Sequence, residues 1–393
     1  MKLSNNFTIR SSQIPYEIEQ FLAVTKKNHW EYVIRNIENT SGHYYKNYLY
    51  IRNPLAKALQ IYFELAKKGL SIYQYQNKEI YFLGKITHLF NHLYNNFNKH
   101  AKNILIGRIK DDDVRSILFE FKIATHFFTR GFDIDFVEYD KRANYNRIFD
   151  LLLIKDGKEL EVECKYKNYD SKRKITRPAL YLLVDLIISE IDISKFNCLI
   201  AFEFKSMLSK NRDIQSIIID NLKLKLNSKD WSKSEYDKFT LEIFPLAFSG
   251  VLDTTEKVIN AIKPYYTENC HFVSLSSNKN NLLLRFSTLE KENIAEGIYE
   301  SLKDSLQQFS KSRAGIIACH IEGIYPEEWE KLRNGSSLSE ITKLIFSKAE
   351  NNFIHSIIYS SKSDELFIDN IFKSNTPNLS FKNLNSKFHN TEP

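Results

Sequence analysis

The most regular pattern of polar and apolar positions in the chain lies between residues 149 and 165. Two predicted strands, residues 149–154 and 159–165, flank the dipeptide Asp156-Gly157, which is a strong signal for a β-hairpin. Successive side chains of a strand point to opposite faces. The second strand therefore has a polar face, Glu159, Glu161, Glu163 and Lys165, and an apolar face, Leu160, Val162 and Cys164.

The segments around this hairpin predict an α/β arrangement. Residues 111–129 have the apolar spacing of a helix, which begins at three aspartates and ends at Gly131. Residues 132–139 alternate as a strand does. After the hairpin, Pro178 precedes a predicted helix at 179–190, and residues 196–205 form an apolar strand. The predicted order is helix, three strands, helix, strand.

The N-terminal region has mainly helical periodicity, over residues 14–37, 55–68 and 79–104. Asn53-Pro54 predicts a capped helix start and Gly69 a helix end. Residues 44–51 are compatible with a short strand. His88 and His92 share one face of a predicted helix, but no third metal ligand is evident, so packing or surface roles are favoured. We interpret residues 1–105 as a helical accessory domain that recognises a partner or substrate.

Downstream of residue 210 the pattern is again α/β. Helices are predicted at residues 213–226, 291–309 and 337–350, and strands at 282–286, 314–320, 353–359 and 365–371. The predicted domains are therefore a helical region at 1–105, an α/β core at 106–210, and a C-terminal α/β domain or sheet extension at 211–393.

Composition narrows the class of protein. A hydrophobic fraction of 43% supports substantial cores, and a net charge of +7 is compatible with nucleic-acid binding. The four cysteines include no C-x-x-C pair, which argues against a zinc site or a disulfide framework and favours a reduced, cytoplasmic setting. We expect neither a signal peptide nor a membrane-spanning segment. The sequence leaves a homo-oligomer open.

The acidic residues of the hairpin suggest a metal site. Asp150 opens the first strand, across from Glu163 and Lys165 on the second. Clustered carboxylates repel one another unless a cation lies between them, and oxygen ligands suit Mg²⁺ or Mn²⁺. Glu120 lies at the edge of the apolar stripe of the preceding helix. The alternative is a solvated sheet face on which Lys165 pairs with a neighbouring glutamate, together with an ordinary flanking glutamate at 120.

A basic segment follows the hairpin. Between residues 166 and 177 the only acid is Asp170, and the basic residues are Lys167, Lys172, Arg173, Lys174 and Arg177. Basic side chains beside an acidic pocket would suit a polyanionic substrate, because they hold phosphates while the acids hold metal. The alternative is a solvated loop.

Taken together, these residues resemble the PD-(D/E)xK, or restriction-endonuclease-like, nuclease superfamily. The matching residues are Glu120 in the helix, Asp150 in the middle strand and Glu163-Cys164-Lys165 in the third, with 13 residues from Asp150 to Glu163. Phe149 stands where proline is typical. The resemblance covers roughly residues 111–205 and implies an αβββαβ core.

The resemblance also implies roles. Asp150, Glu163 and the backbone carbonyl of Cys164 would bind Mg²⁺ or Mn²⁺, and Glu120 would complete the shell. Lys165 would orient or help deprotonate the attacking water, or neutralise developing charge. The implied activity is a DNA endonuclease of restriction or antiviral-defence type, with DNA favoured over RNA. The alternatives are a catalytically inactive nucleic-acid-binding module and a protein-interaction scaffold.

Overall fold

The computed structural model describes residues 10–70, 78–111, 113–137, 149–168, 173–246, 252, 254–265, 270–277, 280–289, 294–322, 329, 331–332, 334–335, 337–361 and 379–388. The chain forms two compact units. Unit 1 comprises residues 1–38, 50–169 and 294–393, and unit 2 comprises residues 39–49 and 170–293. Both combine helices with a sheet, which confirms the predicted α/β class.

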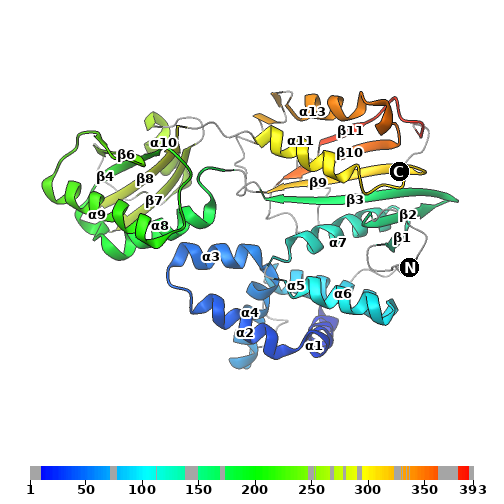
Figure 1. Ribbon diagram of the computed structural model, residues 1–393. Coiled ribbons are helices and arrows are strands. Elements are labelled where there is room, and N and C mark those ends of the chain that lie inside the picture. The colour runs from blue at the N-terminus through cyan, green and yellow to red at the C-terminus, as the bar shows by residue number, and fades with distance from the viewer. Residues whose placement is uncertain are drawn as a thin grey trace. The chain divides into compact units, whose positions relative to one another are not determined.

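Unit 1 is built on a six-stranded sheet (Figure 1). Its strands lie in the order β1 (Asp133–Phe136), β2 (Leu151–Lys155), β3 (Lys158–Asn168), β9 (Ala314–Glu322), β10 (Ile354–Ser361) and β11 (Leu379–Lys382). The first three strands are antiparallel neighbours. Strand β9 runs parallel to β3 and to β10, and β11 is antiparallel to β10.

The predicted hairpin is confirmed as β2 and β3. Its turn residues Asp156 and Gly157 have φ angles of 51° and 75°, the left-handed backbone that a two-residue hairpin turn requires. Across the pair, Leu151 faces Val162 and Leu152 faces Glu161. This register puts the acidic residues of β3 on one face of the sheet and its apolar residues on the other.

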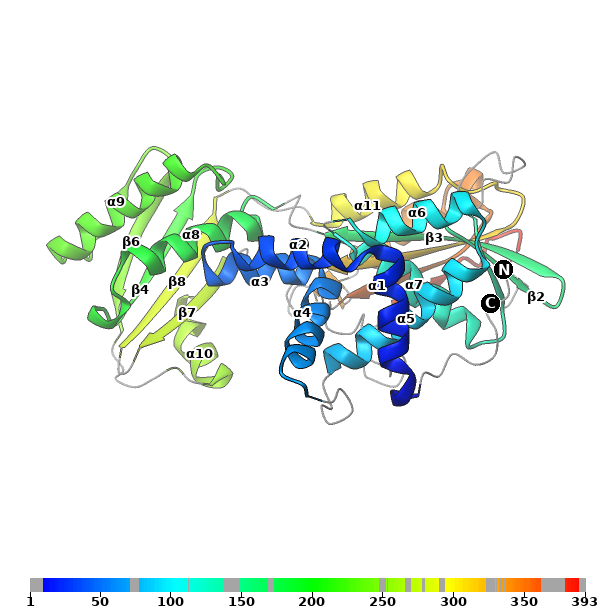
Figure 2. The same ribbon diagram turned by 90° about the horizontal axis from the view of Figure 1, so that it is seen from below.

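Helices cover both faces of this sheet (Figures 1 and 2). One face carries α7 (Arg115–Phe128) and the N-terminal helices, and the other carries α11 (Ile294–Ser305) and α13 (Ser337–Phe346). The N-terminal helices of unit 1 are α1 (Ile14–Thr25), α2 (Lys27–Glu38), α4 (Pro54–Lys67), α5 (Lys78–Asn96) and α6 (Lys99–Ile109), whereas α3 (His43–Arg52) begins in unit 2. Short 3₁₀ turns lie at Ser11–Gln13 and Ala349–Asn351.

The N-terminal helices form largely as predicted. Asn53 caps α4 by accepting a hydrogen bond from the backbone N–H of Ala56 at 3.0 Å. Lys26, with φ of 68°, divides the predicted helix at 14–37 into α1 and α2. The expected strand at 44–51 is instead part of α3, because the Asp185 carboxylate accepts the backbone N–H groups of Tyr44 and Tyr45 and so caps this helix from a distant segment.

These helices do not form a separate domain. Side chains of α1, α4 and α5 belong to the same hydrophobic core as α7, β2 and β3. Residue 105 therefore lies inside a continuous core, and the predicted domain boundary there is wrong. The apolar stripes that made the helices predictable face this shared core.

Unit 2 contains a five-stranded sheet. Its strands lie in the order β5 (Ser234–Glu235), β6 (Phe239–Pro245), β4 (Cys198–Phe204), β8 (Asn280–Thr288) and β7 (Cys270–Ser277). Helices α8 (Arg177–Glu190) and α9 (Arg212–Ser228) pack on one face, and α10 (Thr255–Ile262) packs on the other. Two 3₁₀ turns lie at Ile193–Lys195 and Lys263–Tyr265.

The sheet of unit 1 is completed differently from the prediction. The helix at 179–190 and the strand at 196–205 both form, but in unit 2. The neighbour of β3 is β9, with Glu163 beside Ile317 and Lys165 beside Cys319. The boundaries predicted at 106–210 and 211–393 are therefore wrong, because pairing between parallel strands distant in sequence leaves no local pattern. The expected strand at 365–371 lies outside the described residues.

No helix in the described part of the chain combines the length and apolar character needed to cross a membrane.

Candidate active site

The acidic face of β3 is buried. The exposed fraction is 0% for Glu161 and 1% for Glu163, so these side chains are not the solvated face considered above. Because burying an ionised carboxylate is costly unless it is paired, each buried acid requires partners within the protein. Those partners decide what each acid can do.

Asp150 is fixed against the E-x-K segment. It lies just before β2, where its backbone N–H donates to Val162 O at 3.1 Å. Its carboxylate Oδ2 accepts a hydrogen bond from the backbone N–H of Cys164 at 2.6 Å. Cys164 is the residue between Glu163 and Lys165. This hydrogen bond therefore holds the Asp150 carboxylate beside these two residues, as the sequence predicted.

Glu163 and Lys165 form an ion pair, with 2.6 Å between Oε1 and Nζ. Burial acts to lower the pKa of Lys165, but the nearby negative charges of Glu163, Asp150 and Asp304 outweigh it and raise that pKa. The ammonium group is therefore charged in neutral solution. Of the roles open to Lys165, orienting or neutralising negative charge fits, and proton abstraction does not.

The Cys164 side chain lies on the opposite face, within the hydrophobic core. Burial, together with the charges of Asp150, Glu120 and Glu163, raises the pKa of the thiol well above its usual value, against the opposing effect of Arg108. The thiol is therefore protonated and unsuited to nucleophilic chemistry. The same interactions show that three carboxylates lie within electrostatic reach of one sulfur atom.

Glu120 is held by an arginine that the sequence gave no reason to expect. Arg108 Nη1 donates to Glu120 Oε2 at 2.8 Å, and Nη2 donates to Oε1. In the described part of the chain, no three His, Cys, Asp or Glu side chains are grouped as ligands for one metal ion. In this structure Glu120 is held in a bidentate ion pair with Arg108, and it is not grouped with Asp150 and Glu163 as one ligand set.

The remaining donors suit a hard divalent cation. Asp150 and Glu163 offer carboxylate oxygens, and Cys164 offers its backbone carbonyl. Each carboxylate oxygen can accept more than one contact, so the existing hydrogen bond and ion pair do not prevent metal binding. Oxygen donors of this kind fit Mg²⁺ or Mn²⁺ rather than a softer metal. The thiol of Cys164 points away from them, so sulfur takes no part in this donor set.

Glu161 belongs to a structural contact instead. It accepts hydrogen bonds from the backbone N–H of Ser310 at 2.9 Å, from the Ser310 hydroxyl, and from Arg313 Nη1 at 3.2 Å. Arg313 also pairs with Glu159 through Nε. These contacts tie the first half of β3 to the segment preceding β9.

The predicted phosphate-binding residues fall in different units. Lys167 lies half-buried on β3 in unit 1, whereas Arg173, Lys174 and Arg177 belong to unit 2. Arg173 is only 1% exposed, so the prediction that it contacts a substrate phosphate is wrong for this structure. Lys172 lies outside the described residues.

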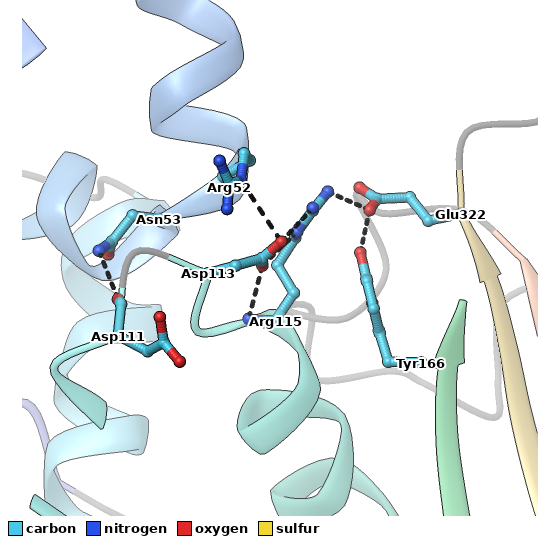
Figure 3. Close-up of polar contacts among 7 residues, drawn as sticks. All are labelled: Arg52, Asn53, Asp111, Asp113, Arg115, Tyr166 and Glu322. Atoms are coloured by element: carbon cyan, nitrogen blue, oxygen red, sulfur yellow. Dashed lines mark hydrogen bonds and ion pairs between the residues drawn. The ribbon is translucent and has the colours of Figure 1, made fainter. Parts of the chain in front are cut away.

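A second charged cluster lies on the other face, near the ends of β3 and β9 (Figure 3). The buried Arg115 donates from Nε to Asp113 at 2.7 Å and from Nη1 to Glu322, which also accepts from the Tyr166 hydroxyl. Arg52 contacts Asp113 at 3.4 Å. The sequence signal that could have revealed this cluster is Arg115 itself. It lies in the first turn of a helix, where a positive charge is unfavourable without an acid beside it.

Comparison with known proteins identifies no relative: no protein-family model, no curated protein and no solved structure matches this chain.

Proposed function

We propose that the chain is a metal-dependent nuclease that hydrolyses phosphodiester bonds, with DNA as the favoured substrate. The observation that carries this proposal is the hydrogen bond between Asp150 and the backbone N–H of Cys164. It holds one carboxylate against a segment in which a second carboxylate, Glu163, is paired with a persistently charged lysine.

The order of elements in unit 1 supports the proposal. Helix α7 precedes three antiparallel strands, and α11 then leads to β9, which lies parallel to β3. This is the αβββαβ order expected of a restriction-endonuclease-like core. We propose that unit 1 contains such a core and that most of unit 2 is an insertion between its third strand and second helix. A role in restriction or antiviral defence is an analogy with that fold.

The residues would divide the chemistry as follows. Asp150, Glu163 and the carbonyl of Cys164 would hold Mg²⁺, which supplies Lewis acidity and lowers the pKa of a bound water. Lys165, as an ammonium group, would orient the attacking water and stabilise negative charge at phosphorus. Lys167, two positions further along the same face of β3, would contact the substrate backbone.

A second candidate is a nucleic-acid-binding module without catalysis. It is favoured by the contacts that each carboxylate already makes within the protein: Glu120 with Arg108, Glu163 with Lys165 and Asp150 with Cys164. A module of this kind would bind nucleic acid in a salt-dependent way without metal, and Lys165→Ala would leave that binding in place.

The deciding experiment compares cleavage of supercoiled plasmid, linear DNA and RNA in Mg²⁺, Mn²⁺ and EDTA. Wild type is tested beside Asp150→Asn, Lys165→Ala and a matched control, Glu159→Gln, which removes a charge from the same strand outside the proposed site. Metal-dependent cutting that both site variants lose and the control retains supports the nuclease. Metal-independent binding without cutting by wild type supports the binding module.

A further inference from the structure

Two buried polar groups on adjacent strands of unit 2 have no hydrogen-bond partner in the described part of the chain. Arg285 belongs to β8, and Ser274 belongs to the neighbouring strand β7. The Nε–H group of Arg285 and the hydroxyl of Ser274 are both shielded from solvent and unpaired. Because a buried polar group without a partner is costly, two of them on neighbouring strands point to a ligand that satisfies both.

The strand register places both side chains on one face of the sheet. Ala201 of β4 is paired with Arg285 and belongs to the hydrophobic cluster beneath α10, so Arg285 points to the same face. Across the antiparallel pair, Arg285 lies opposite Phe272. Ser274 is two positions further along β7 and is therefore the diagonal neighbour of Arg285 on that face. Diagonal neighbours are about 7–8 Å apart, a distance that a long arginine side chain spans.

No described carboxylate is paired with the positive charge of Arg285. Among the described residues, the guanidinium makes one hydrogen bond, from Nη1 to the backbone carbonyl of Tyr265 at 3.2 Å, and no ion pair. Glu242 lies in the same row of the sheet but two strands away, a spacing of about 10 Å. Glu203, on the adjacent strand, lies 3.8 Å from the ammonium group of Lys233 instead. An arginine stays protonated in proteins, so this charge is permanent.

The second edge of the guanidinium suits an oxyanion. Since Nη1 contacts Tyr265, a ligand would approach the edge formed by Nε and Nη2, and two oxygens of a carboxylate or phosphate group match that edge. The Arg285 side chain is partly exposed, so a solute can reach it. We propose that Arg285 and Ser274 form a binding site for a small oxyanion, in which the guanidinium holds two oxygens and the Ser274 hydroxyl donates to one of them.

Isothermal titration calorimetry on the full chain tests this proposal. The probes are sodium phosphate and sodium acetate, with ionic strength held constant by sodium chloride and with EDTA present, so that no metal ion holds phosphate at the proposed active site. Saturable binding of at least one probe is expected, and the tighter probe identifies the group that the site takes. Arg285→Gln should weaken binding at least about tenfold, because it removes a charge-assisted bidentate contact. Ser274→Ala, which removes one hydroxyl, should weaken it about threefold.

The matched control is Arg212→Gln, which removes the same charge from an exposed position at the start of α9 in the same unit. It should bind as wild type does. If Arg285→Gln does not fold, Arg285→Lys decides instead, because it keeps the charge but loses the bidentate edge and should weaken binding about fivefold. No binding of either probe by folded wild type, an unchanged affinity in the deciding variant, or an equal loss in the control overturns the proposal. None of these outcomes depends on nucleic-acid cleavage.

Discussion

The two halves of the polar face of β3 follow one alternating pattern but have different partners. Glu161, in the first half, is held by a backbone N–H, a hydroxyl and a guanidinium from the segment before β9. Glu163, in the second half, is paired with Lys165 and lies close to Asp150. Both glutamates are fully buried. Burial alone therefore does not separate a structural acid from a candidate catalytic acid, whereas the identity of the partners does.

The largest effect is expected when each of these two glutamates is replaced by glutamine. Glu163→Gln should lower metal-dependent cleavage about 10³-fold, because it removes a proposed metal ligand and the partner of Lys165. Glu161→Gln should leave cleavage per folded molecule unchanged but lower the free energy of unfolding by about 1–3 kcal/mol. Plasmid nicking normalised to folded protein measures the first effect, and urea denaturation measures the second. Equal loss of cleavage in both variants would remove the distinction.

The next test concerns Glu322, a buried acid on the opposite face of the sheet. Glu322→Gln should destabilise the protein by about 3 kcal/mol, because Arg115 would lose one of its two carboxylate partners in a buried setting. Tyr166→Phe, which removes one hydroxyl donor to Glu322, should cost only about 1 kcal/mol. Urea denaturation of the two variants measures both losses in the free energy of unfolding. A Glu322 variant as stable as wild type would show that this cluster does not contribute to the fold.

The pH dependence of stability separates neutral from charged buried groups. Burial, together with the charges of Lys122 and Arg115, lowers the pKa of His320 to about 3. The unfolded chain, with an ordinary histidine pKa near 6.5, therefore binds more protons between these values, so stability falls as the pH drops from about 6.5 towards 3. Between pH 5 and pH 4, wild type should lose about 1.4 kcal/mol more than His320→Asn. Parallel losses would mean that this imidazole is not buried.

The smallest effect is expected at the turn of the hairpin. Gly157→Ala should cost about 1 kcal/mol, because the added methyl meets open space but the backbone has φ of 75°. Asp156→Gly, at the neighbouring left-handed position, should be neutral or slightly stabilising. Thermal denaturation ranks the two variants, and cleavage per folded molecule should match wild type in both. A large loss of cleavage would show that the turn sets the geometry of the distant end of β3.

The sequence was sufficient where local rules decide the structure. Asp-Gly required a left-handed turn, the alternation after it divided β3 into two faces, and Asn53 provided a helix cap. It also gave the position of Asp150 relative to the E-x-K segment, because hairpin pairing follows from the turn. All of these features depend on residues close together in the chain.

Features that depend on distant residues were not predictable from local patterns. The pairing of β3 with β9, the ion pair between Arg108 and Glu120, and the burial of Arg173 arise from packing between separate elements. The contact between Glu17 and His88 is of the same kind, since it joins an acid on α1 to a histidine on α5. A single sequence contains the residue types for these contacts but no signal that pairs them.

The separation of β3 from β9 also has a consequence for synthesis on the ribosome. Strand β3 ends at Asn168 and its parallel neighbour begins at Ala314, 146 positions later. At about 5–20 residues per second, roughly 7–30 s pass before the nascent chain can complete this sheet. During that interval the hairpin presents an open backbone edge on which a foreign strand could pair. The charged side chains along β3 would act as gatekeepers against aggregation until β9 leaves the exit tunnel.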